Sequence, residues 1–157
     1  MRTVIKLAGA LLEDDAVVRS ISRQIAELAK EGHEILDHTG IAEGSLVFTT
    51  HLLPLARGIL STIYVTLKEA QRAGDIEAMY RKFYADRKMV RIWPGGKLPE
   101  LQHVAHTNFA DIGFALDKSG RRLIVVSCLD NLGKGAAGQA VQNFNHMLGI
   151  EEHTALQ

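Results

Sequence analysis

Two apolar runs on either side of a short polar turn constrain the fold of this chain most strongly. Phe109–Leu116 and Arg121–Leu129 flank Asp117-Lys-Ser-Gly120, and this order predicts two antiparallel strands joined by a turn. Runs rich in β-branched and aromatic residues predict further strands at 46–50, 59–67 and 89–93. Few strands alternate with helices, so the sequence predicts an α+β fold: a mixed, mainly antiparallel sheet with helices packed on one face.

The N-terminal residues predict an additional β-α unit. Residues 3–7 are suited to a short strand, and residues 15–31 carry apolar side chains at helical spacing. Further helices are predicted at 34–39, at 75–86 with Asp75 as the N-cap, and at 136–148. We expect residues 3–7 to join the sheet or its edge, and helix 15–31 to cover one face of the sheet.

Composition limits the kinds of partner. The 157 residues suffice for one domain with a core. A formal net charge of zero argues against nucleic acid and against an anionic membrane surface, because both attract basic proteins. No apolar run approaches the roughly 20 residues that span a bilayer, and the N-terminus lacks a signal-peptide pattern. The single cysteine cannot form a disulfide within the chain and fits a reducing compartment, so we expect a cytoplasmic protein. We also expect no metal site.

A glycine-rich stretch near the C-terminus needs interpretation. Gly133-Lys-Gly-Ala-Ala-Gly138 spells G-x-G-x-x-G, which in a dinucleotide-binding unit is followed by a helix, a second strand and an acidic residue about 20 positions later. No strand follows here, so the match fails its context. Cys128 lies in an alternating strand without a neighbouring base; we interpret it as a buried structural thiol and predict no catalytic residue.

Three long blocks resemble the C-terminal part of the N-acetyl-γ-glutamyl-phosphate reductases. Residues 48–65 (FTTHLLPLARGILSTIYV) are similar to the family's F-T-P-H-L-x-P-x-x-R-G-I-L-x-T-I-Y-V, residues 107–113 (TNFADIG) to S-N-x-x-D-I-G, and residues 125–143 to V-V-S-x-x-D-N-L-x-K-G-A-A-G-Q-A-x-Q-N. The resemblance implies that residues 35–157 form a reductase C-terminal, catalytic and dimerisation, domain. It further implies the fold of glyceraldehyde-3-phosphate dehydrogenase-type reductases, arginine biosynthesis, NADP as cofactor, and a homo-oligomer built through the sheet face.

Residues 1–34 resemble a different family. Val4–Leu12 and Ile25–Glu34 are similar to the beginning of acetylglutamate kinase, although that family usually has two glycines where this chain has Ala8-Gly9. The resemblance implies that Lys6 and Gly9 could meet a phosphate. The two segments would join near residues 32–36, as in a natural or engineered gene fusion. We expect them to form one integrated domain.

The reductase resemblance also implies candidate binding residues, each with a structural alternative. His51 and Arg57 would lie near the substrate phosphate, or would only pin their turn through backbone carbonyls. The loop after the last strand would approach the nicotinamide end of the cofactor, or would be a tight turn that needs glycine for its geometry. The residues of that loop are Asn131, Lys134, Gly135, Ala136 and Gly138.

Three functions remain open from the sequence. The chain resembles part of a reductase, but it has no G-C-Y-x-T-type motif for a nucleophilic cysteine and no recognisable nucleotide-binding unit. We therefore expect it to be inactive by itself, because acyl transfer to a thiol needs a thiolate beside a base. The alternatives are a noncatalytic folded or oligomerisation module and, with less support, a kinase-related activity.

Overall fold

The computed structural model describes residues 3–6, 46–49, 51 and 53–156. The helices expected at 15–31 and 34–39, and Gly9, lie outside the described residues. The side chains of Lys6 and of the other residues of the first strand are also outside that description.

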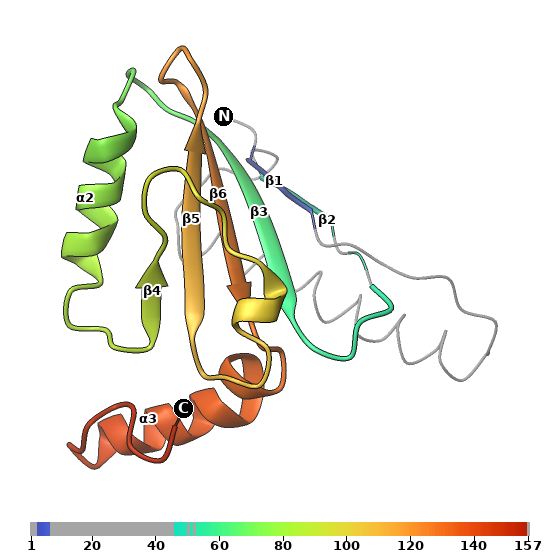
Figure 1. Ribbon diagram of the computed structural model, residues 1–157, viewed down its shortest axis with the longest axis vertical. Helices are drawn as coiled ribbons and strands as arrows, with labels where there is room; N and C mark the ends of the chain where they lie inside the picture. Colours follow the sequence, from blue (N-terminus) through green and yellow to red (C-terminus); the bar gives the residue numbers. More distant parts are fainter. Residues whose placement is uncertain (1–2, 7–45, 50, 52, 157) are drawn as a thin grey trace.

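The described strands form one sheet of six, in the order β2-β1-β3-β6-β5-β4 (Figure 1). Their bounds are β1 Thr3–Lys6, β2 Leu46–Thr49, β3 Ile59–Thr66, β4 Val90–Ile92, β5 Ala110–Leu116 and β6 Arg122–Leu129. β3 pairs antiparallel with β1 and β6, and β6 with β5. The two outer pairs, β1 with β2 and β4 with β5, are parallel. The predicted mixed, mainly antiparallel sheet is confirmed.

The N-terminal strand is part of this sheet. β1 lies between β2 and β3, with Val4 opposite Tyr64 and Ile5 opposite Phe48. The expectation that residues 3–7 join the sheet is therefore met by residues 3–6.

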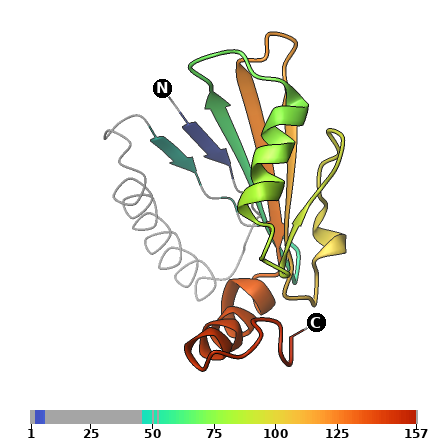
Figure 2. The ribbon, with the colours of Figure 1, turned by 90° about the vertical axis from the view of Figure 1, so that its left-hand side faces the viewer.

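Helix α2, Ala73–Phe83, covers one face of the sheet (Figure 2). It begins and ends earlier than the predicted 75–86, and Asp75 lies in its first turn instead of capping it; Arg72 is the N-cap, without a side-chain cap. The side chain of Ile76 packs with Phe114 and Val125 in one core cluster. The opposite face carries a second cluster in which Val104 contacts Val126 and Cys128, beside the short 3-10 helix η1 Leu101–His103.

The last helix does not lie on either face. α3, Gly138–Met147, lies beyond the end of the sheet (Figures 1 and 2). It follows directly on a five-residue π-helix, η2 Gly133–Ala137. The wide turn arises because the N–H of Gly135 donates to the carbonyl of Asp130 and the N–H of Ala137 donates to that of Leu132, both five residues back. Of the helix predicted at 136–148, residues 138–147 are α-helical, and residues 136 and 137 belong to the π-helix.

Cys128 occupies the position that its alternating pattern predicts. It is fully buried in β6, and its Sγ lies 3.5 Å from the carbonyl oxygen of Pro99. Burial raises the pKa of this thiol to about 12, with Asp111 and Glu100 adding to the effect. The prediction of a buried strand thiol is confirmed.

Candidate functional site

Asp130, the first residue after β6, connects three segments of the chain. Its buried carboxylate accepts hydrogen bonds from the backbone N–H groups of His106 at 2.6 Å, Gly133 at 2.7 Å and Leu132 at 2.8 Å. Nη1 of Arg57 lies 3.1 Å from Oδ1 and 3.3 Å from Oδ2 of the same carboxylate. One side chain therefore holds the 103–108 loop, the start of η2 and the turn before β3 together.

The charge of Asp130 is stabilised despite its burial. Desolvation raises the pKa of this carboxyl, but the N–H groups of Gly133, His106 and Leu132, followed by Arg57, outweigh that effect and lower it to about 2. The carboxylate thus occupies donors at the start of η2 that would otherwise be available to an external anion.

The turn that carries His51 and Arg57 is fixed on the same loop. The N–H of Gly58 donates to Oδ1 of Asn131 at 2.8 Å, and Gly58 has a φ of +118° that favours glycine. The partner of Arg57 is the carboxylate of Asp130. The sequence analysis had named backbone carbonyls as the partners that would pin this turn if it had only a structural role. About a third of the Arg57 side chain remains exposed, and His51 is exposed as well.

Two glycines of the 131–138 loop are required by packing within the chain. A Cβ on Gly138 would overlap Oδ1 of Asn108, and one on Gly133 would lie 2.6 Å from the carbonyl oxygen of Thr107. Gly135, Ala136 and Ala137 are instead exposed. The loop therefore presents small residues and backbone to the outside, while its glycine ends are packed against the 103–108 loop.

A chain of polar side chains continues behind this loop. Lys134 and Asn108 both donate to Oε1 of Gln142, whose Nε2 donates to Glu152 at 2.8 Å. Burial lowers the pKa of Lys134, opposed by the charge of Glu152. Lys134, which the resemblance proposed as a cofactor-binding residue, thus directs its ammonium group toward Gln142.

A cavity of about 500 Å³ lies beside this network. It is lined by His106, Thr107, Asn108, Gly133, Gly138 and the C-terminal Ala155 and Leu156. Oδ1 of Asn108 is buried there without a hydrogen-bond partner among the described residues. The cavity brings the 107–113 and 125–143 sequence blocks together at one place.

The second buried carboxylate, that of Asp111, connects two strands of the sheet. Asp111 of β5 accepts hydrogen bonds from Arg91 at 2.6 and 2.8 Å and from Nε1 of Trp93 at 2.9 Å. The Arg91 guanidinium also lies 4.3 Å from the centroid of the Phe109 ring. This group fixes the short strand β4 to β5.

The sequence analysis singled out the glycine loop and the turn that the structure brings together, but it missed Asp130 and Asn108. An Asp directly after a strand and three residues before a glycine is a turn and helix-cap signal that could have identified Asp130. No local signal identifies Asn108, because its neighbours Gly138 and Gln142 are about 30 residues away in the chain.

Metal and membrane signals are absent from the described part. Within residues 46–49, 51 and 53–156, together with β1, no three His, Cys, Asp or Glu side chains gather as a metal site would require. No helix among the same residues is long and apolar enough to cross a membrane.

Comparison with known proteins gives three kinds of match. Residues 23–131 match the family described as semialdehyde dehydrogenase, dimerisation domain. The N-acetyl-gamma-glutamyl-phosphate reductase of Alkaliphilus metalliredigens is 43% identical over 157 aligned residues, covering 96% of this chain and 45% of the relative. That of Desulfotalea psychrophila is 49% identical over 113 residues, covering 72% of this chain and 33% of the relative. The chain thus spans between a third and just under a half of these relatives.

A solved structure supports the fold. The crystal structure of aspartate semialdehyde dehydrogenase II from Vibrio cholerae superposes with a TM-score of 0.57 at 14% identity, covering 94% of this chain and 55% of that one. At this identity the match concerns the fold, which agrees with the mixed sheet described above.

Proposed function

Because the chain belongs to the semialdehyde dehydrogenase dimerisation-domain family and is homologous to N-acetyl-gamma-glutamyl-phosphate reductases, we propose that it is the part of such a reductase that closes one side of the active site. The reaction would be the NADPH-dependent reduction of N-acetylglutamyl phosphate to the semialdehyde, in arginine biosynthesis. The nucleophilic thiol would come from outside the matched region, since Cys128 is fully buried and its pKa is raised to about 12.

The hydrogen bonds of Asp130 to Arg57, His106, Leu132 and Gly133 are the observation that supports this proposal most. It holds the Arg57 turn and the 131–138 loop against each other through hydrogen bonds of 2.6 to 3.3 Å. If Arg57 binds the substrate and the 131–138 loop contacts the cofactor, the two must stay at a fixed distance from each other, because reacting groups must be held in one geometry.

Arg57 is suited to an anion even though Asp130 holds it. The three N–H groups bound to Asp130 already stabilise its charge, and Arg57 contacts it through Nη1. A guanidinium has five donors in a planar fork, so Nε and Nη2 can face a phosphate while Nη1 keeps the ion pair. Arg57 would thus bind the acyl phosphate, and exposed His51 lies on the same turn.

The 131–138 loop fits one end of NADP better than the other. Its exposed Gly135, Ala136 and Ala137 suit contact with the flat nicotinamide ring. The N–H groups of Leu132 and Gly133 are occupied by Asp130, so the pyrophosphate finds no cradle here. When bound, NADPH supplies the hydride; this chain would position the ring and leave the phosphates to another domain.

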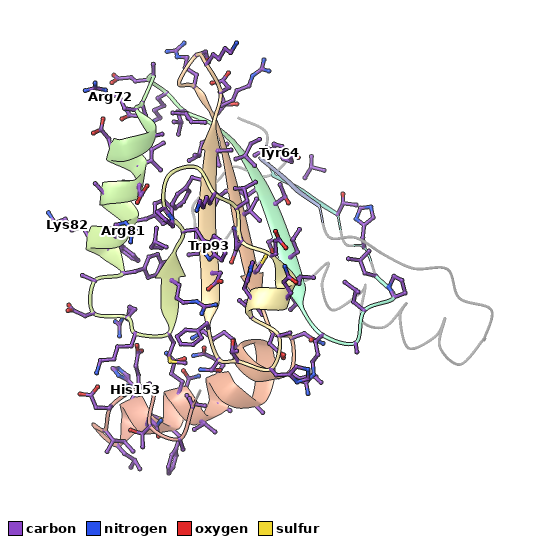
Figure 3. The ribbon with its side chains drawn as sticks, viewed as in Figure 1. Tyr64, Arg72, Arg81, Lys82, Trp93 and His153 are labelled. Carbon is purple, nitrogen blue, oxygen red and sulfur yellow. The ribbon has the colours of Figure 1, made fainter. Side chains whose placement is uncertain are left out.

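A noncatalytic oligomerisation module is the second candidate. Tyr64 of β3, labelled in Figure 3, lies on the sheet face opposite α2, and its side chain is 45% exposed. With Arg122 and Ile124 it lines a cavity of about 420 Å³. A homo-oligomer through this face would bury Tyr64. Light scattering would give a dimer or larger mass, and Tyr64→Glu would return it toward the monomer; a monomeric wild-type mass at high micromolar concentration would contradict this.

The kinase resemblance remains a proposal for residues 1–34, within one integrated domain with residues 35–157. The family match begins at residue 23 and therefore crosses the proposed join. A kinase origin would make Lys6 and Gly9 bind the phosphates of ATP. A cytoplasmic location follows from the same biosynthetic role.

Thermal shift separates these functions. A ligand at 100 times its Kd stabilises a protein by about 2.7 kcal/mol. Inorganic phosphate should raise the melting temperature of the wild type but not of Arg57→Met if the reductase proposal holds. A shift with ATP would support the kinase alternative. If phosphate raises the melting temperatures of the wild type and of Arg57→Met equally, Arg57 is not the phosphate ligand.

A further inference from the structure

The cavity of about 500 Å³ contains a hydrogen-bond acceptor without a partner. Asn108 lines this cavity and is only 3% exposed, and its Oδ1 has no hydrogen-bond partner among the described residues. Gly138, which lies against this oxygen, has no side chain that could cover it. A buried acceptor without a donor costs free energy, and native proteins contain few of them. An unpaired oxygen in the wall of a cavity therefore indicates a ligand that brings a donor.

The orientation of the Asn108 amide is fixed by its neighbours. Lys134 and Nδ2 of Asn108 both donate to Oε1 of Gln142. An ammonium group can only donate, so the Gln142 atom that faces Lys134 must be the amide oxygen. The Asn108 atom that faces this oxygen must then be the amide nitrogen. Nε2 of Gln142 donates to Glu152, which agrees with this assignment. The network thus leaves Oδ1 of Asn108 as the unpaired atom.

The backbone around the same cavity adopts an uncommon conformation. Within the part of the chain that the structure describes, the residues other than glycine with a positive φ are His106 at +63° and Ala155 at +60°. Both line this cavity. The N–H of His106 is held by the carboxylate of Asp130 at 2.6 Å. Such conformations cost free energy and are concentrated at binding sites, so the strain and the unpaired acceptor concern one place.

The walls of the cavity determine which chemical group fits. No Asp, Glu, Lys or Arg lines it, and Ala155 and Leu156 contribute apolar surface. The hydroxyl of Thr107 already donates to the carbonyl of Val104. A buried ammonium group would have no counter-charge here, and an unpaired buried charge costs more than a neutral amide. The group that fits is therefore neutral, with one N–H and a small apolar end, as in an acetamido group.

We propose that this cavity binds the acetamido group of the reductase substrate, with its N–H donating to Oδ1 of Asn108 and its methyl group against Leu156. This inference rests on the proposed function. Oδ2 of Asp130 holds His106 in the cavity wall, and Oδ1 of Asp130 lies 3.1 Å from Nη1 of Arg57. N-acetylglutamyl phosphate carries its phosphate and its acetamido group at opposite ends of a short chain. Arg57 and Asn108 would thus hold its two ends.

The carboxamide of NADP is a less suitable occupant, although it offers the same donor. The surface assigned above to the nicotinamide ring is the exposed segment 135–137. The cavity is lined instead by Gly133 and Gly138, the two ends of the loop that pack against the 103–108 loop. The substrate and the cofactor would therefore use different sides of one loop.

Two neutral probes that differ in one N–H test the site. N-methylacetamide has this donor and N,N-dimethylacetamide lacks it. Each is titrated into the full chain, and binding is followed by the NMR signals of the backbone amides of Thr107, Gly133 and Gly138. N-methylacetamide should bind about tenfold more tightly, because the other probe leaves the buried acceptor unpaired. Equal affinities overturn the proposal, and so does a failure of both probes to bind at millimolar concentrations.

Variants locate the probe. Asn108→Leu should abolish the preference for N-methylacetamide, whereas Asn143→Leu, the same change at an exposed position of α3, should preserve it. Leu156→Trp fills the cavity from the opposite wall without touching the Asn108 network, so it remains informative if Asn108→Leu does not fold. It should weaken binding of both probes. A preference that survives Asn108→Leu, or binding that Leu156→Trp leaves unchanged, overturns the proposal.

Competition identifies the source of the amide. N-acetylglutamate should displace N-methylacetamide, and glutamate, whose ammonium group replaces the amide, should not. Displacement by glutamate to the same extent overturns the acetamido assignment. Displacement by nicotinamide but not by N-acetylglutamate overturns it as well, because the occupant would then be the cofactor.

The amide probes also separate this inference from the proposed function, because they contain no phosphate and require no contact with Arg57. Phosphate binding that depends on Arg57, without binding of either amide, refutes this inference and leaves the reductase proposal standing. A preference for N-methylacetamide that depends on Asn108, without phosphate binding through Arg57, supports the amide site and refutes the phosphate role of Arg57.

Discussion

Arg57 and Asp130 lie 73 residues apart in the chain, yet Nη1 of Arg57 is 3.1 Å from Oδ1 of Asp130. The same carboxylate accepts three backbone N–H groups. The ion pair therefore joins the entry of β3 to the exit of β6, at the end of the sheet where η2 and α3 begin. A change at Asp130 should affect the turn and the loop together.

Asp130→Asn should lower the free energy of unfolding at pH 7 by about 2 kcal/mol or more. The folded pKa of about 2 lies below the ordinary value of 3.8, so the ionised carboxylate stabilises the fold above about pH 4. That contribution is lost as the pH falls from about 4 to about 2. Urea unfolding at pH 7 and pH 3 measures it, with exposed Asp86→Asn as control. A difference between wild type and variant that does not shrink at low pH would contradict this assignment.

Gly138→Ala should destabilise the protein by about 1 to 3 kcal/mol, because its methyl group would overlap Oδ1 of Asn108. Gly74→Ala is the matched control: Gly74 lies in α2 with no atom within 4 Å of an added Cβ. Alanine there should stabilise by about 0.5 to 1 kcal/mol, since it favours the helix. Thermal unfolding of both variants tests the pair. A neutral Gly138→Ala would mean that the Asn108 side chain can move away.

Arg91→Met should cost about 3 kcal/mol, because it leaves the carboxylate of Asp111 buried without its cation. Lys88→Met removes an ion pair of similar length, 2.9 Å, to Glu151, but both of those side chains are well exposed. That variant should lose less than about 1 kcal/mol. Denaturant midpoints at constant slope compare them. Equal losses would show that burial of Asp111 does not set the energy.

Cys128 should not react with thiol reagents in the folded protein at pH 8, because its thiol is fully buried and its pKa is raised to about 12. An Ellman titration should detect it only after addition of urea. The unfolded thiol ionises near pH 9 while the folded one keeps its proton, so Cys128 lowers the free energy of unfolding only above about pH 9. Fast labelling of the native protein would refute this.

The chain by itself should not oxidise NADPH with the acyl phosphate. Nucleophilic catalysis needs an accessible thiolate with a base in hydrogen-bond reach, and the sequence contains one cysteine, which is buried. The absorbance of NADPH, which falls when NADPH is oxidised, should stay constant with wild type and Cys128→Ser alike. Activity that Cys128→Ser abolishes would show that Cys128 is catalytic after all.

The sequence by itself determined the type and order of most described elements. Alternation along Arg122–Leu129 fixes which side chains face each cluster, because successive residues of a strand point to opposite faces. The same alternation is sufficient to bury Cys128. The polar turn at 117–120 likewise joins β5 to β6, because its Asp117 carboxylate accepts from Ser119 and from the following backbone.

Only the tertiary structure decided how the candidate site is assembled. Arg57, Asn108 and Asp130 have no periodic relation in the chain, and their contacts depend on β3, β5 and β6 pairing in one register. Nor does the helical pattern at 138–147 say which side of α3 turns inward. Burial of Asn145 was set by the two carbonyl oxygens of the C-terminal segment that it binds, since a buried amide is stable only where such partners exist.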